Sequence, residues 1–312
     1  MVKRVVLAAP RGYCAGVERA IETVERALAQ HGPPVYVRKQ IVHNAHVVAE
    51  LTARGAVFVD DVHEVPEGAL VVFSAHGIAP AVRRGAAARS LQTIDATCPL
   101  VTKVHAEARR YAAAGYTIVL VGHAGHEEVE GTMGEAPESI VLVESVRDAR
   151  RLEVDDPERV AYVTQTTLSV DETREIVGVL RRRFPSLHGP DKEDICYATT
   201  NRQRGVKDLL SRVQLLLVIG SANSSNSQRL VDVARAGGVD AYLIESEREL
   251  EERWLRGVET VGVTSGASAP ESLVERVCTW FRARGVEDIT ELGGAEENVF
   301  FRLPPEVRSP AA

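Results

Sequence analysis

Three cysteines are the residues of this chain best suited to chemistry. The chain has 312 residues and four cysteines, which lie too far apart in sequence to suggest a disulfide framework. No two of them form a Cys-x-x-Cys pair, so neither a zinc ribbon nor a thioredoxin-type motif is indicated. Cys14, Cys98 and Cys196 each open a segment in which apolar residues recur with helical periodicity, and Pro99 stands where proline favours a helix start.

A cysteine at the start of a helix is suited to binding a metal. The partial positive charge of the helix N-terminus lowers the pKa of a thiol and favours the thiolate. Three thiolates are soft ligands that suit an iron–sulfur cluster or a zinc ion. A complete 4Fe–4S cluster usually takes four cysteines, so three leave one metal position open for catalysis. Cys278 could be a fourth ligand, but its apolar helical surroundings favour a place in the core.

Polar side chains follow several of the expected strands. Glu128 lies in one such loop, and a carboxyl group buried there among negative neighbours would have a raised pKa and could donate a proton. Neither a P-loop nor a Gly-x-Gly-x-x-Gly motif is present, so a nucleotide is not indicated. Together with backbone N–H groups, these neutral or switchable side chains could bind a phosphate or diphosphate: His43, His76, His126, Ser224, Asn226 and Ser268.

The elements that must position these residues recur three times along the chain. Each repeat has a strand, a cysteine, a helix, a strand, a polar loop, two more strands and a second polar loop. Strands that alternate with helices predict parallel α/β units, whose ligands gather beyond the carboxyl ends of the strands. The sequence therefore predicts an α/β fold, a trefoil of three pseudo-symmetric modules with the cysteines at its centre. The strands after the cysteine helices are expected at residues 35–37, 117–121 and 215–219.

These repeats also set the expected domain boundaries. Module 1 spans residues 15–97, module 2 spans 98–194, and module 3 combines 1–14 with 195–283. Residues 284–312 form a C-terminal tail. Within the tail, Asn298–Leu303 resembles a short strand, which would either close over the site or pack at an edge.

The composition excludes several classes of protein. With 45% hydrophobic and 26% charged residues the chain reads as an ordinary soluble globular protein. Its net charge of −7 gives no basic footprint, so a nucleic-acid partner is not expected. The apolar segment Val5–Ala9 is too short for a signal peptide, and no apolar run approaches the length of a membrane span. We therefore expect a cytoplasmic protein without a membrane partner, and a monomer because no apolar stripe is evident.

Nine segments of the chain closely resemble the 4-hydroxy-3-methylbut-2-enyl diphosphate reductase (IspH/LytB) family. The resemblance runs from about residue 5 to residue 303, and the motifs occur in order along the chain. Several of these motifs are eight or more residues long, which makes chance agreement negligible. They include PRGYCAGVERAI, FSAHG, DATCPLVTKVH, GHAGHEEVEGTMG, EDICYATTNRQ and GSANSSNSQRL.

The resemblance implies an activity and a cofactor. The reaction is the two-electron reductive dehydroxylation of (E)-4-hydroxy-3-methylbut-2-enyl diphosphate to isopentenyl diphosphate and dimethylallyl diphosphate. This is the last step of the non-mevalonate isoprenoid pathway. The family fold is a trefoil around a 4Fe–4S cluster, and Cys14, Cys98 and Cys196 match its ligands. The fourth iron binds the substrate hydroxyl and could be lost on oxidation, which leaves a 3Fe–4S cluster. The external one-electron donor would be a ferredoxin or a flavodoxin.

The resemblance also implies a role for each site residue. Glu128 matches the carboxylate that delivers a proton, beside Glu127, which could perturb it. Thr167 matches a threonine that bonds toward the substrate hydroxyl, with Thr166 next to it. His126 matches a histidine near the diphosphate and the proton path. The residues that match diphosphate ligands, or share their loop, are His43, His76, Ser224, Ser225, Asn226 and Ser268.

Two other functions remain open from the residues alone. In a zinc hydrolase, the three thiolates would hold Zn²⁺ and Glu128 would act as the base, so the protein would be colourless and indifferent to oxygen. A non-catalytic iron–sulfur carrier or sensor would be coloured but would have no need for an anion-binding pocket.

Overall fold

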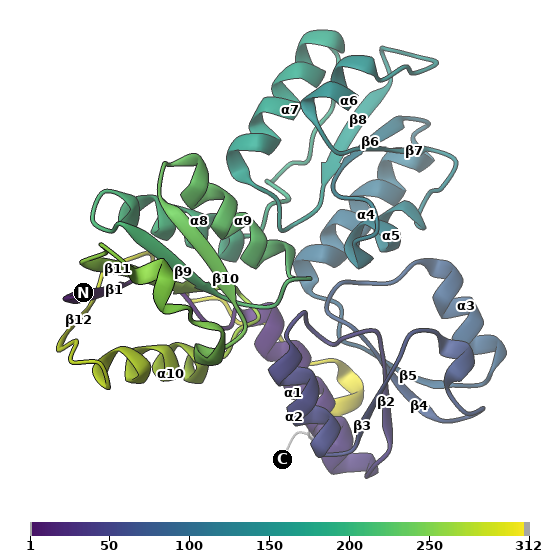
Figure 1. Ribbon diagram of the computed structural model, residues 1–312. Coiled ribbons are helices and arrows are strands. Elements are labelled where there is room, and N and C mark those ends of the chain that lie inside the picture. The colour runs from purple at the N-terminus through teal and green to yellow at the C-terminus, as the bar shows by residue number, and fades with distance from the viewer. Residues whose placement is uncertain (1, 309–312) are drawn as a thin grey trace. The chain divides into compact units, whose positions relative to one another are not determined.

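The computed structural model describes residues 2–308 and is of the α/β class (Figure 1). All strand pairs in its three sheets are parallel. The chain forms two compact units. The first contains the N-terminal residues up to Ala15, His43–Ala45 and Tyr197–Phe300, and the second contains Gly16–Val42, His46–Cys196 and the residues from Phe301 on.

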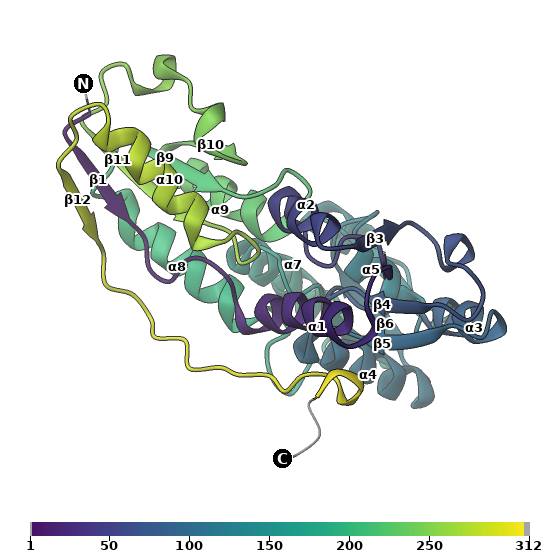
Figure 2. The same ribbon diagram turned by 90° about the horizontal axis from the view of Figure 1, so that it is seen from below.

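The first unit is built on a five-stranded sheet with the order β10-β9-β11-β1-β12. Val261 of β11 is in register with Val5 of β1 on one side and with Leu215 of β9 on the other. Figure 2 shows β12 beside β1 at the edge of the sheet, and the chain then continues as an extended segment. The elements are β1 (Arg4–Leu7), α8 (Tyr197–Leu210), β9 (Leu215–Ile219), α9 (Ser225–Ala236), β10 (Asp240–Ile244), β11 (Thr260–Ser265), α10 (Glu271–Arg282) and β12 (Asp288–Glu291), with short 3₁₀ turns at Glu247–Glu249 and Glu252–Leu255.

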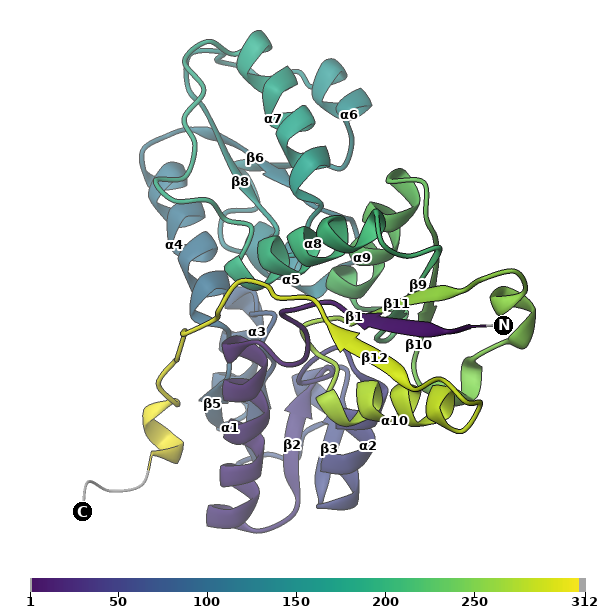
Figure 3. The ribbon, with the colours of Figure 1, turned by 90° about the vertical axis from the view of Figure 1, so that its left-hand side faces the viewer.

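The second unit contains two smaller sheets, with the orders β3-β2-β4-β5 and β7-β6-β8. In Figure 3, α4 lies on one side of β6 and β8, and α6 and α7 lie on the other. The elements are α1 (Ala15–His31), β2 (Val35–Arg38), α2 (Ala45–Ala53), β3 (Ala56–Val59), β4 (Leu70–Phe73), α3 (Pro80–Ala88), β5 (Gln92–Asp95), α4 (Pro99–Ala113), β6 (Thr117–Val121), α5 (Glu127–Met133), β7 (Ile140–Val143), α6 (Val146–Arg151), β8 (Val160–Thr164) and α7 (Val170–Arg183), with 3₁₀ turns at Val62–Glu64 and Pro305–Val307.

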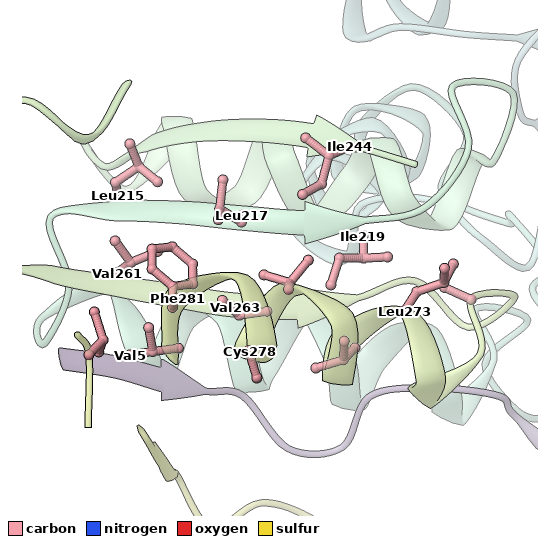
Figure 4. Packing of buried hydrophobic residues seen from close by; sticks show 14 of the residues in the cluster. Val5, Leu215, Leu217, Ile219, Ile244, Val261, Val263, Leu273, Cys278 and Phe281 are labelled. Carbon is pink, nitrogen blue, oxygen red and sulfur yellow. The ribbon is translucent and has the colours of Figure 1, made fainter. Parts of the chain in front are cut away.

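Alternate residues of the central strands pack against helices on opposite faces, as expected for a sheet buried on both sides. Leu215, Leu217 and Ile219 pack in one cluster with α10, whereas Leu216 and Val218 pack with residues of α8 and α9. Figure 4 shows α10 against this sheet, with Cys278 inside the cluster. Cys278 is only 4% exposed, so its expected place in the core is confirmed.

The predicted strand positions are confirmed, and two expectations are wrong. Thr117–Val121 and Leu215–Ile219 are strands with those bounds. The strand expected just before Cys196 is absent: between α7 and Cys196 the structure describes only an isolated bridge of His188 with Ala161. Asn298–Leu303 is also not a strand: Phe300 is 81% exposed, and β12 already covers the edge of β1. β12 itself was not predicted because it is short, polar and half-exposed, and so lacks apolar alternation.

Among residues 2–308, no helix combines the length and the apolar character needed to cross a membrane.

Candidate active site

Each of the three predicted cysteines precedes a helix, as expected. Cys14, Cys98 and Cys196 stand immediately before α1, α4 and α8, and Cys98 is the N-cap of α4 with Pro99 at the first helical position. None of the three forms a disulfide, and all three have intermediate exposure. A partly exposed thiol at a helix start is the environment that favours the reactive thiolate.

The backbone of each cysteine is fixed by a loop at the carboxyl end of a strand. Cys14 N donates to Ala267 O at 3.1 Å, after β11. Cys98 N donates to Ala75 O at 2.9 Å, after β4, and Cys196 N donates to Thr166 O at 3.0 Å, after β8. One hydrogen bond therefore recurs in all three repeats, at the carboxyl end of the equivalent strand.

In the first unit, the polar residues predicted from sequence gather at the start of α9. Ser224 is the N-cap of this helix, and its Oγ accepts a hydrogen bond from Ser227 N. Ser268 Oγ donates to His43 O at 2.9 Å, and Asn223 Nδ2 lies 3.3 Å from His43 Nδ1. Less than a tenth of the surface is exposed in each of the five predicted residues His43, Ser224, Ser225, Asn226 and Ser268.

Asn226 connects this cluster to the loop that fixes Cys14. Its Oδ1 accepts from Ala267 N at 2.9 Å, and its Nδ2 donates to Thr199 Oγ1 at 3.2 Å. The carbonyl of the same Ala267 accepts the hydrogen bond from Cys14 N. Buried hydroxyl and amide groups at a helix N-terminus form an environment that stabilises an anion.

In the second unit, Glu128 is buried against the loop after β8. It is 2% exposed, and its carboxylate accepts hydrogen bonds from Thr166 N at 2.5 Å and Thr166 Oγ1 at 3.2 Å. Burial raises the pKa of Glu128 to about 7, and the nearby charge of Asp194 acts in the same direction, whereas the bonds from Thr166 oppose it. The direction of this shift agrees with the prediction; burial is its main cause, and Asp194 is the acidic neighbour that adds to it.

His126 and His76 surround the start of α5. His126 is the N-cap of this helix, and its Nδ1 accepts from Glu128 N at 3.1 Å. His76 Nδ1 lies 3.0 Å from Glu127 Oε2, and the His76 and His126 rings meet edge to face with centroids 5.9 Å apart. Burial lowers the pKa of His76 to about 4, so the ring is neutral at pH 7. Glu127 is thus a partner of His76, a role that the sequence did not reveal.

The hydroxyl group of Thr167 has a hydrogen-bond partner in the same loop. Its Oγ1 accepts a hydrogen bond from Gln165 Nε2 at 2.9 Å, and Gln165 Oε1 accepts from His123 N at 3.2 Å. Thr166 is 5% exposed and contacts Glu128 through both its backbone and its hydroxyl group. The second unit therefore brings together Glu128, Thr166, His126 and His76.

Asp194 and Lys103 were missed by the sequence reasoning. The Asp194 side chain is fully buried and accepts hydrogen bonds from Thr164 N and Lys103 Nζ, both at 2.8 Å. Burial raises the pKa of Asp194 to about 7, although Lys103 acts against this rise. An acidic residue two positions before a ligand-like cysteine was the available signal, but acidic residues near cysteines are usually solvated.

A second missed group is the buried pair of His105 and Glu135. His105 Nδ1 lies 2.8 Å from Glu135 Oε1, and Arg109 contacts the other carboxylate oxygen at 2.8 Å. The His105 ring faces two glycines, Gly77 and Gly131, where any Cβ would lie 3.0–3.3 Å from it. Because Gly77 follows His76 and Gly131 belongs to α5, His105 fixes the distance between two parts of the site.

Fold and site together define an α/β protein with thiols at helix starts, a buried polar helix start and a buried carboxylic acid. The family model described as LytB protein matches residues 5–282, and the chain belongs to this family. A relative named 4-hydroxy-3-methylbut-2-enyl diphosphate reductase in Acidothermus cellulolyticus is 61% identical over 98% of this chain and 90% of its own length. A relative of the same name in Nocardia farcinica is 58% identical over 98% and 92%.

A solved structure agrees with the fold of this chain. It is the E-1-hydroxy-2-methyl-but-2-enyl-4-diphosphate reductase from Plasmodium falciparum, with a TM-score of 0.93 and 39% identity over 98% of this chain and 97% of that one. A second solved structure, of an (E)-4-hydroxy-3-methyl-but-2-enyl diphosphate reductase, gives a TM-score of 0.63 and 34% identity over 91% and 100%.

Proposed function

We propose that this chain is a 4-hydroxy-3-methylbut-2-enyl diphosphate reductase that converts its substrate to isopentenyl and dimethylallyl diphosphate. The observation that carries the proposal is the buried Glu128 carboxyl group. Its pKa of about 7 leaves it partly protonated at neutral pH, and Thr166 fixes its position. A reaction in which a hydroxyl leaves as water needs a proton donor of this kind.

The donor set fits an iron–sulfur cluster. Cys14, Cys98 and Cys196 are partly exposed and form no disulfide, and each has its backbone fixed in the same way. Three thiolates hold three irons of a 4Fe–4S cluster and leave the fourth without a protein thiolate. When bound, the cluster supplies electrons one at a time and a Lewis-acidic iron for the C–O bond. Loss of that iron on oxidation would give a 3Fe–4S cluster.

The diphosphate is bound by neutral donors and by the start of α9. His43, His76, Ser224, Ser225, Asn226 and Ser268 provide the polar groups, and the N-terminus of α9 adds its partial positive charge. These groups are buried and have lost hydrogen bonds to water, and a bound anion replaces those hydrogen bonds.

Glu128 then delivers the proton. Thr166 holds the carboxyl group in place, Thr167 orients the substrate hydroxyl, and His126 fixes the start of the helix that carries Glu128. Glu128 must be reprotonated in each cycle, and we assign that step to His126, the N-cap of the same helix. The substrate is thereby held and protonated within a site from which bulk water is excluded.

The same proposal covers the partners and the organisation of the chain. The electron donor is an external ferredoxin or flavodoxin, and the enzyme works as a monomer in the cytoplasm. Its three modules span residues 15–97, 98–194 and 1–14 with 195–283, and they form a trefoil with the cluster at the centre.

The test is anaerobic purification followed by metal analysis and turnover. We expect a brown protein with about four irons per chain that bleaches on dithionite and reduces the hydroxylated diphosphate. One zinc per chain and no colour would favour the hydrolase and overturn the proposal. A brown protein in which neither the parent nor Glu128→Gln turns over the substrate would indicate a carrier instead.

A further inference from the structure

The first unit contains a buried ion pair that the proposed reaction does not use. The Arg202 side chain, on α8, is fully buried, and its Nη1 lies 3.1 Å from Glu297 Oε1. Asn201 Nδ2 donates to the same carboxylate oxygen at 3.0 Å. Glu297 comes from the segment between β12 and Phe300, which has neither helix nor strand. Buried ion pairs add little net stability, so this one calls for another role.

The Arg202 guanidinium also holds the loop that leads to Cys14. Its Nη2 donates to Gly12 O at 2.7 Å, and its Nη1 donates to Ala198 O, in the first turn of α8, at 3.1 Å. Gly12 has a φ of 76°, a left-handed conformation that glycine adopts readily. One side chain therefore links the turn before Cys14 to the start of α8.

The C-terminal segment packs on the same loop from another side. A Cβ at Gly294 would lie 2.0 Å from Ala9 O, so this segment approaches the loop as closely as two backbones can. A Cβ at Gly205 of α8 would lie 2.8 Å from the same oxygen. The loop before Cys14 is thus held between α8 and the C-terminal segment, and Glu297 is the charged contact of that segment.

We propose that Arg202 and Glu297 are positioning residues that order the Cys14 loop before any cluster binds. Glu297 neutralises and orients the guanidinium, which then fixes Gly12 and, through it, the direction of Cys14. The role in cluster binding rests on the proposed function, whereas the order of the loop is a property of the protein itself.

The experiment compares Glu297→Gln with Glu296→Gln by hydrogen exchange of the metal-free protein. Glu296 is the exposed neighbour, so its variant removes the same charge without touching Arg202. We expect amides of residues 9–14 to exchange at least about tenfold faster in Glu297→Gln, with β9 unchanged and the Glu296 variant like the parent. Unchanged exchange at 9–14, or an equal rise throughout the unit, would overturn the proposal.

Anaerobic reconstitution with iron and sulfide tests the second half of the proposal. We expect Glu297→Gln to take up iron and sulfide several-fold more slowly than Glu296→Gln, because a mobile ligand must be ordered during binding. Equal uptake rates would mean that the ion pair does not position the ligand. A parent protein that takes up no cluster would instead refute the proposed function, and the exchange result would still stand.

Discussion

At the scale of single residues, burial decides the chemistry of Glu128 more than any charged neighbour does. A carboxyl group in water would be ionised at pH 7, but desolvation raises the pKa of Glu128 to about 7. Sequence reasoning predicted this rise from an acidic residue in a polar loop. It did not reveal Thr166 as the partner or Asp194 as the neighbour, because both contacts depend on how separate loops meet.

The acid role of Glu128 predicts the pH dependence of the reaction. The group is protonated below its pKa, so kcat/KM should fall as pH rises through about 7. Glu128→Gln should lose about 100-fold or more in activity, since a positioned acid typically contributes that much. The residual activity should lack the fall in kcat/KM near pH 7, the limb of the pH profile that Glu128 produces. A variant that keeps this limb would show that another group donates the proton.

The same raised pKa predicts a pH-dependent cost to stability. The pKa of Glu128 is about 7 in the folded protein and near 4.5 in the unfolded chain. The protonated carboxyl group therefore stabilises the fold below pH 4.5 relative to alkaline pH, and this contribution is lost as the pH rises through 7. The side chain in Glu128→Gln is neutral at every pH. The free energy of unfolding of this variant, relative to that of the parent, should therefore rise by up to about 3 kcal/mol between pH 4.5 and pH 8. Urea unfolding at both pH values measures the difference, and a constant difference would contradict it.

The lowered pKa of His76 leads us to expect proton uptake when a diphosphate binds. Burial holds the pKa of His76 near 4, so the ligand-free ring is neutral, and a bound anion should raise that pKa. Inorganic diphosphate should bind more tightly at pH 6 than at pH 8, with protons taken up from the buffer. Calorimetry in buffers of different ionisation enthalpy reads this uptake directly. In His76→Gln, part of the uptake should disappear.

At the scale of elements, the close approach of α5 to His105 and to the backbone of Gly77 positions Glu128, which lies at the start of α5. A Cβ at Gly131 of α5 would lie 3.2 Å from His105 Cε1 and 3.4 Å from the backbone of Gly77. Gly131→Ala should therefore destabilise the protein by about 1–3 kcal/mol, despite the better helix propensity of alanine. Gly178 of α7 is the matched control, because its nearest neighbour would be the flexible end of Arg182 at 3.7 Å.

The expected outcomes of the two glycine variants have opposite signs. Gly178→Ala should stabilise the protein by about 0.5–1 kcal/mol, the usual gain for a helical glycine in open space. Urea unfolding of both variants measures the contrast. If both were stabilised to the same extent, the packing of His105 against α5 would have no structural importance.

Strands with a strong apolar pattern could be predicted from the sequence, whereas a strand that forms only because it pairs with a neighbouring strand could not. Leu215–Ile219 is apolar throughout and buried on both faces, so its bounds follow from the sequence. Asp288–Glu291 is a strand only because β1 offers it an edge. Asn298–Leu303 has the apolar composition of a strand but is not paired with one, so its composition alone was misleading.

At the scale of the whole molecule, the repeated layout is what identified the site. Any one cysteine is usually a buried apolar residue, as Cys278 is here. The three that open helices are instead partly exposed, and the backbone of each is fixed by a loop that follows a strand. The layout could be predicted because it depends on the order of elements. The hydrogen bonds that fix each cysteine could not, since they join segments far apart in sequence.

The layout predicts which thiols the molecule needs for its cluster. Cys14→Ala, Cys98→Ala and Cys196→Ala should each lose most of the iron after anaerobic purification, because each removes one of the three proposed protein ligands. Cys278→Ala should keep the iron of the parent, since that thiol packs among apolar residues of α10 and β1. A ligand that binds only the folded state raises its stability, so the parent and Cys278→Ala should lose thermal stability on chelation. The three ligand variants, already without cluster, should not respond. Full iron in any one of these three variants would contradict the assigned ligand set, and loss of iron in Cys278→Ala with unchanged folding would make that residue a fourth ligand.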